Sequence, residues 1–124
     1  MSIRLDVDNI ITMKKDLIQF ADFNELDFRV GEVKEASIIE KSKHLIKLVV
    51  DLGVDYGMVT ILSGLAPIYT PEDLLGNKYI VLANLAPKQM MGMNSNGMIL
   101  VADDPEKFEL VPLDKKIKNG TVIR

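Results

Sequence analysis

Short apolar runs separated by turn residues limit the possible folds of this 124-residue chain more than any other feature. From Asp27 onward, segments rich in β-branched residues alternate with Gly, Asn, Asp and Pro. Runs of this length and composition are typical of β-strands in small barrels and sandwiches. The sequence therefore predicts a mainly β protein. The expected strands cover residues 28–39, 45–53, 58–65, 78–85 and 97–102, with a further candidate at 108–113.

A short helix is expected between the third and fourth strands, over residues 70–75. Thr70 is suited to cap this helix, Pro71 suits its first position, and Glu72 and Asp73 favour its positive end. Three strands, a short helix and two strands follow the order of an OB-fold. We therefore expect a five-stranded OB-fold barrel, with a short helix between strands 3 and 4 and with N- and C-terminal extensions.

The first 26 residues are harder to assign. Four apolar residues there have nearly helical spacing: Ile10, Met13, Leu17 and Phe20. Residues 17–20 suit a short strand equally well, so both alternatives stay open. We treat residues 1–19 as an N-terminal extension and residues 20–124 as the binding domain.

Charge and hydropathy exclude several classes of protein. A net charge of −3 argues against non-specific binding to nucleic acids or anionic membranes, although it allows a local basic patch. The apolar runs are shorter than the roughly 20 residues of a membrane span, so no membrane partner is expected. The N-terminus does not resemble a signal peptide, and the chain has no cysteine. We expect a cytoplasmic protein.

The sequence offers little support for catalysis. His44 is the one histidine of a chain without cysteine, which argues against a zinc site. There is no phosphate loop, dinucleotide fingerprint or nucleophile elbow. The acid pairs Asp6/Asp8 and Asp103/Asp104 are explained more simply as turn or cap residues. We therefore predict that the chain is not an enzyme and needs no metal or cofactor.

A polar segment rich in methionine interrupts two apolar runs, and it reads NLAPKQMMGMNSNGM over residues 84–98. Local chemistry allows two interpretations. Asn and Gly suit a simple connection between strands, with methionines filling gaps in the core. Alternatively, the same polar groups form the functional surface.

Three ordered blocks bear on this question: DFNELDFRVGEV (22–33), ILSGLAPIYTPEDLLGNK (61–78) and VLANLAPKQMMGMNSNGMILVA (81–102). Together they resemble the structure-specific tRNA-binding domain family, which includes the free beta subunit and the C-terminal appendage of methionyl-tRNA synthetase. The family signature runs Asp-Leu-Arg-Val-Gly, then Ser-Gly-Ile with Tyr-x-Pro-Glu-x-Leu-x-Gly, then Asn-Leu-x-Pro-x-Lys-x-x-Gly-x-x-Ser-x-Gly-Met. The resemblance covers residues 20 to 124.

The third block departs from the signature only in small offsets, since Lys88 directly follows Pro87, whereas another segment departs more. Members commonly carry His-Pro-x-Ala-Asp-Lys-Leu between the first two strands, whereas this chain has IIEKSKHLIKL over residues 38–48. Ser42 stands in place of the alanine, and His44 lies near the usual lysine position. Three lysines keep the segment basic: Lys41, Lys43 and Lys47.

The resemblance implies a tRNA site at the ends of strands four and five. Phosphates favour Lys and Arg, whereas 2′-hydroxyls and base edges favour Asn and Ser. The expected contacts are Asn84, Lys88, Ser95, Asn96 and Met98, with a basic rim of Arg29, Lys41, Lys43 and Lys78. Because aromatic residues make up only 6% of the chain, we expect recognition of RNA shape rather than serial base stacking.

The resemblance implies a non-catalytic tRNA-binding protein that assists an aminoacyl-tRNA synthetase in trans, with the methionyl enzyme as the first choice of partner. The alternative is a dimeric peptide-binding chaperone from the secretion-related branch of the same fold. A homodimer is expected in either case, because apolar segments lie outside the predicted barrel. These apolar residues are Ile10, Ile11, Met13, Leu17 and Ile18 at the start, and Leu110, Val111, Leu113 and Ile117 at the end.

Overall fold

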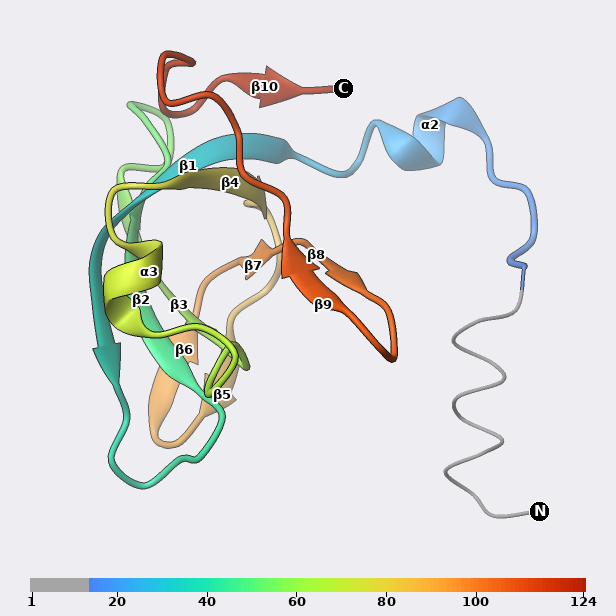
Figure 1. The fold of residues 1–124 in the computed structure, drawn as a ribbon. Helices are drawn as coiled ribbons and strands as arrows, with labels where there is room; N and C mark the ends of the chain where they lie inside the picture. Colours follow the sequence, from blue (N-terminus) through green and yellow to red (C-terminus); the bar gives the residue numbers. More distant parts are fainter. Residues whose placement is uncertain (1–13) are drawn as a thin grey trace, which may run out of the picture.

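A computed structural model describes residues 14–124 (Figure 1). Its elements, in chain order, are α2 (Phe20–Phe23), β1 (Phe28–Ile38), β2 (Ile46–Asp51), β3 (Met58–Ser63), α3 (Pro71–Leu74), β4 (Lys78–Leu82), β5 (Lys88–Met90), β6 (Met93–Ser95), β7 (Met98–Ile99), β8 (Val101–Asp103), β9 (Phe108–Leu110) and β10 (Val122–Ile123). Among these residues, no helix has the length and apolar character needed to cross a membrane.

Five antiparallel strands form a nearly closed barrel in the order β3-β2-β1-β4-β7. The long strand β1 pairs with β4 through residues 28–32 and with β2 through residues 32–38. A shift in register between Val33 and Glu35 lets β1 bend from one pairing to the other. The barrel closes where β6 and β7 contact β3. The predicted OB-fold barrel is confirmed.

The barrel interior follows the alternation of side chains along the strands. Ile46, Leu48 and Val50 on β2 are fully buried, while the residues between them lie nearer the surface. Gly31 sits at the crowded centre of β1. A Cβ atom at this position would lie 2.6 Å from the Cγ1 atom of Val50, so the packing itself requires a glycine.

The helix α3 lies between β3 and β4, as predicted, and its local chemistry explains its start. The Thr70 Oγ1 atom accepts a hydrogen bond from the Asp73 backbone N–H at 3.3 Å, and the Asp73 carboxylate accepts one from the Thr70 N–H at 2.9 Å. Leu74 is buried and holds the helix against the barrel. The helix covers Pro71–Leu74, because Leu75 is already extended.

The second half of the chain contains more strands than predicted. The segment 84–98 includes the hairpin β5–β6, and the strand expected over 97–102 divides into β7 and β8. The division allows β8 to leave the barrel and pair with β9 as a separate hairpin. The candidate strand at 108–113 is present as β9. The C-terminal strand β10, which pairs with the start of β1, was not predicted.

The N-terminal arm packs little against the barrel. Residues 14–19 have no regular structure, so neither predicted assignment describes residues 17–20 completely. The four-residue helix α2 has no buried residue. Its Phe23 ring lies 6.3 Å from the ring of Phe28, at the start of β1. Ile10 and Met13 lie outside the described residues, and the domain boundary at residue 20 stays a prediction.

Candidate functional site

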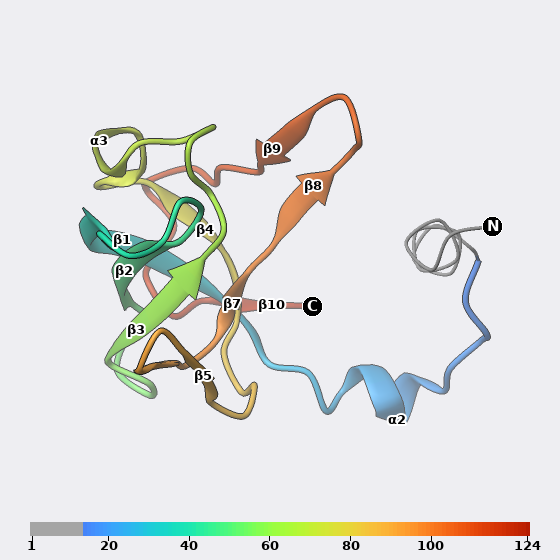
Figure 2. The same cartoon turned by 90° about the horizontal axis from the view of Figure 1, so that it is seen from below.

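A groove of about 410 Å³ opens beside the β5–β6 hairpin, between the end of β3 and the β7–β8 segment. The strands β3, β5, β7 and β8 can be followed in Figure 2. Its walls are mainly apolar. The lining residues are Leu62, Ser63, Gly64, Leu85, Lys88, Met90, Ser95, Gly97, Met98, Ile99, Val101 and Phe108. The structure therefore brings three predicted site residues together here, namely Lys88, Ser95 and Met98.

Two hydrogen bonds hold this hairpin and its exit against β3. The Ser95 Oγ atom accepts a bond from the Leu62 backbone N–H at 3.0 Å, and the Asn96 N–H donates to the Thr60 carbonyl at 2.8 Å. Ser95 is 5% exposed, so its hydroxyl is already committed to the barrel. Asn96 is half-buried. Ser95 therefore positions the groove wall, whereas Met98 and Lys88 are exposed at its surface.

Asn84 lies at the end of β4 and makes internal contacts. Its Oδ1 atom accepts a hydrogen bond from the Asp27 backbone N–H at 2.9 Å. Its amide nitrogen donates to the Glu25 carbonyl at 2.7 Å. Asn84 thus fixes the link between α2 and β1, away from the residues that line the groove.

Arg29 is held in a charged cluster at the start of β1. Its Nε atom lies 2.7 Å from Oδ1 of Asp27, and its Nη1 atom lies 3.1 Å from both the Asp55 carboxylate and the Gly120 carbonyl. The Tyr56 hydroxyl also donates to Asp27, at 2.5 Å. The hydrogen bond from Arg29, supported by Tyr56, lowers the pKa of the Asp27 carboxyl despite its partial burial. Arg29 therefore joins β1 to the C-terminal segment.

Lys78 is 9% exposed, which is unusual for a lysine. Its Nζ atom donates a hydrogen bond to the Ile117 carbonyl at 2.5 Å. The side chain thus fixes the segment before β10 rather than extending a surface rim. Two members of the predicted basic rim, Arg29 and Lys78, have this kind of structural contact.

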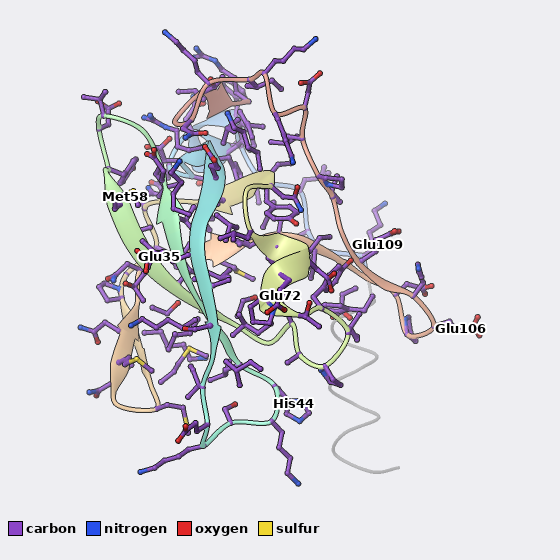
Figure 3. All side chains as sticks on the ribbon, turned by 60° about the vertical axis from the view of Figure 1, so that its left-hand side comes forward. Glu35, His44, Met58, Glu72, Glu106 and Glu109 are labelled. Atoms are coloured by element: carbon purple, nitrogen blue, oxygen red, sulfur yellow. The ribbon has the colours of Figure 1, made fainter. Side chains whose placement is uncertain are left out.

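Lys41 and Lys43 are exposed on the loop between β1 and β2, outside the groove lining. The Ser42 Oγ atom shapes this loop by accepting a hydrogen bond from the Leu45 N–H at 3.0 Å. His44 lies on the same loop and is exposed (Figure 3). Within residues 14–124, no group of three or more His, Cys, Asp or Glu side chains is placed to hold a metal ion.

Four residues of the groove were not predicted from the sequence as site residues: Gly64, Leu85, Met90 and Phe108. Gly64 belongs to the Ser-Gly pair of the second sequence block, which was the available signal for it. Phe108 could not be placed from the sequence, because β8 and β9 reach the groove only after leaving the barrel path.

The barrel, the position of α3 and the groove define a binding module of the OB class. The family model described as "Putative tRNA binding domain" matches residues 28–122, and the chain belongs to this family. The family resemblance drawn from the three sequence blocks is confirmed.

Relatives and solved structures agree with this assignment. The chain is 44% identical over 108 residues to the methionine–tRNA ligase of Archaeoglobus fulgidus, a match that covers 87% of this chain and 16% of the ligase. A MetRS-related protein from Pyrococcus horikoshii is 35% identical with a TM-score of 0.83, over 89% of this chain and 100% of that protein. The chaperone CsaA from Bacillus anthracis is 29% identical with a TM-score of 0.77, over 88% and 100%. The chain thus spans about one sixth of that ligase.

Proposed function

We propose that this chain is a non-catalytic protein that binds folded tRNA and assists an aminoacyl-tRNA synthetase in trans, most simply the methionyl enzyme. The family assignment supports the ligand, and the methionine–tRNA ligases among its relatives support the partner. The observation that carries the proposal is the exposed Lys88 at a groove otherwise lined by neutral side chains. Binding a shared tRNA raises its effective concentration near the synthetase without any chemistry by this chain. This role places the chain in the cytoplasm.

The predicted site residues divide into two roles in this proposal. Lys88 binds a phosphate, while Asn96 and Met98 face the sugar and base beside it. Lys41 and Lys43 add phosphate contacts from the β1–β2 loop. Four further residues act indirectly, because their side chains form hydrogen bonds that hold the surrounding backbone in place: Arg29, Lys78, Asn84 and Ser95.

The Lys88→Glu variant is expected to bind tRNA about tenfold more weakly than the native chain, across different tRNA sequences. A phosphate contact positions RNA without reading its sequence. The slope of log affinity against log salt concentration should fall by about 0.7–0.9, which corresponds to one fewer released counterion. Fluorescence anisotropy with labelled tRNA at several salt concentrations measures both quantities.

Lys115→Glu is the matched control, because Lys115 is exposed between β9 and β10 and does not line the groove. Lys107 is a poorer control, since it precedes the groove residue Phe108. Both glutamate variants change the net charge equally. If Lys115→Glu weakened binding as much as Lys88→Glu, the net charge and not the groove would explain the effect.

The second candidate function is peptide binding, as in a chaperone. The structural similarity to CsaA and the apolar walls formed by Leu85, Met90 and Met98 favour it. Binding of unfolded peptides by the native chain, without measurable binding of tRNA at the same salt concentration, would support this alternative.

We also propose that the chain forms a homodimer through its N-terminal arm. Leu17, Ile18 and Phe20 are 95%, 67% and 74% exposed, which is costly for apolar side chains. Val111 and Ile117 add partly exposed apolar surface, whereas Leu110 is buried in the hydrophobic core and cannot contribute. Ile10, Ile11 and Met13 lie outside the described residues.

Sedimentation at about 50 μM, above the Kd of a micromolar interface, should show a dimer for the native chain. The double variant Leu17→Ser/Phe20→Ser should shift toward monomer, because it removes the apolar surface without touching the barrel. Met58→Ser, which changes an exposed apolar residue on β3, serves as the control and should remain dimeric. A native chain that sediments only as a monomer would contradict the proposal.

A further inference from the structure

Gly64 lies in the groove at a position where neither the backbone nor the packing requires a glycine. Its φ is outside the left-handed region, and an added Cβ atom would meet no other atom within 4 Å. The seven other glycines differ, because six have a positive φ and Gly31 is enclosed by side chains. A glycine at such a position allows a ligand to approach the backbone closely, because it has no side chain. Gly64 therefore marks an open wall of the groove.

The side chains around Gly64 suit a flat group with apolar faces and polar edges. Met90 and Met98 have flexible thioethers that pack well against rings, and Phe108 supplies one aromatic ring. Ser63 lines the same groove and adds a hydroxyl group to it. The groove volume, about 410 Å³, falls in the range of about 300–1,000 Å³ typical of small-ligand sites. It suits one base rather than a stacked row.

The charges around the groove favour one orientation of the bound ligand. Lys88 is the one charged residue of the lining. The β8–β9 hairpin, which brings Phe108 to the groove, has a negative net charge, since it carries one lysine, Lys107, and four acids: Asp103, Asp104, Glu106 and Glu109. Figure 3 shows Glu106 near the tip of this hairpin, with Glu109 closer to the barrel. A phosphate is attracted to the Lys88 side and repelled from the hairpin, so the attached base points toward Phe108.

We infer that the groove seats one unpaired base of the bound RNA, with the adjoining phosphate on Lys88 and the base between Gly64 and Met98. This inference rests on the proposed function and adds a single-stranded element to the recognition of RNA shape. The protein would therefore prefer a folded RNA that exposes an unpaired nucleotide over a continuous duplex.

The test uses the full chain and two kinds of RNA probe. The first is a tRNA transcript, titrated at several salt concentrations with the native chain and with Gly64→Val. The second is a pair of labelled RNAs of equal charge, one a hairpin with a fluorescent base analogue in its loop and the other a continuous duplex. Ala102→Val is the matched control, because Ala102 is an exposed β8 residue whose side chain points away from that of Val101.

Gly64→Val should bind tRNA at least about tenfold more weakly, which matches the loss of one stacked base. Its salt slope should stay native, because Lys88 still binds the phosphate. Met98→Ala should weaken binding in the same direction, and Ala102→Val should bind as the native chain does. The loop analogue should change its fluorescence with the native chain but not with Gly64→Val.

Two outcomes would overturn the inference separately from the proposed function. If the native chain binds tRNA but Gly64→Val binds it equally well, the groove does not seat a base and tRNA binding stands. Equal affinity of the native chain for the hairpin and the duplex would also show that the groove does not seat a base, while tRNA binding stands. If the native chain binds an apolar peptide and no tRNA, both the inference and the proposed function fail.

Discussion

The Gly31→Val variant is expected to lose about 3 kcal/mol or more of folding stability, at the upper end of the usual range for overpacking. The added Cβ atom would lie 2.6 Å from Val50 Cγ1 and 2.9 Å from both Leu52 Cδ2 and Val81 Cγ2. Val50 is on β2 and Val81 is on β4, one on each side of β1, and the buried Leu52 directly follows β2, so none can move without disturbing the barrel. Urea denaturation followed by circular dichroism measures the loss as a lower midpoint.

Gly64→Val provides the control for this prediction, since it adds the same atoms at a glycine with open space around it. It should keep a denaturation midpoint close to the native value while binding RNA more weakly. A loss below about 1 kcal/mol for Gly31→Val would show that the barrel yields easily at β1, contrary to the close packing expected of a protein interior.

The Arg29→Met variant is expected to lose about 2 kcal/mol of stability at neutral pH. Methionine retains much of the apolar stem but removes the hydrogen bonds to Asp27 and to the Gly120 carbonyl. The Asp27 side chain is only 26% exposed, so its charge loses its main partner without gaining full solvation. The measurement is again the urea midpoint at pH 7.

This loss should depend on pH. Arg29 lowers the pKa of Asp27 below its ordinary value, which in unfolded chains is about 3.9. A lowered pKa adds stability above the unfolded value, and this stability is lost as the pH falls through the folded value. The difference between the native chain and Arg29→Met should therefore be largest at pH 5–7 and should narrow below about pH 4.

The Asp55→Asn variant distinguishes the stability contributions of the two carboxylates that contact Arg29. The Asp55 side chain is 70% exposed and lies 3.1 Å from Nη1 of Arg29, so this contact is a surface ion pair. Its removal should change stability by less than about 0.5 kcal/mol. A larger loss for Asp55→Asn than for Arg29→Met would contradict the assignment of Asp27 as the main partner.

The parts of the fold that depend on neighbouring residues could be predicted from the sequence. The start of α3 is one example, because Thr70, Pro71 and Asp73 supply its cap within four residues. Strand β2 is another, because alternating apolar residues are enough to define a half-buried strand. The OB order followed from such local patterns, without any knowledge of strand pairing.

The parts that depend on distant residues could not be predicted. A lysine in a strand is ordinarily a surface residue, yet Lys78 is buried because its Nζ atom reaches the carbonyl of Ile117, 39 positions away. Arg29 meets Gly120 across 91 positions. The hairpin β5–β6 has strands of only three residues, and its turn begins with Met91 at a φ of 51°, where a glycine or asparagine would have been the usual signal. These contacts decide which predicted site residues remain exposed to a ligand.

The pairing of β10 with β1 has a consequence for chains in which this barrel is one part among several. Phe28 pairs with Ile123, so the points where the chain enters and leaves the barrel are on adjacent strands, which lie about 4.8 Å apart. Because its two ends are neighbours, the barrel adds almost no distance between the segments that precede and follow it. Such a barrel can therefore be inserted as a domain in a larger protein while the segments before and after it stay close together.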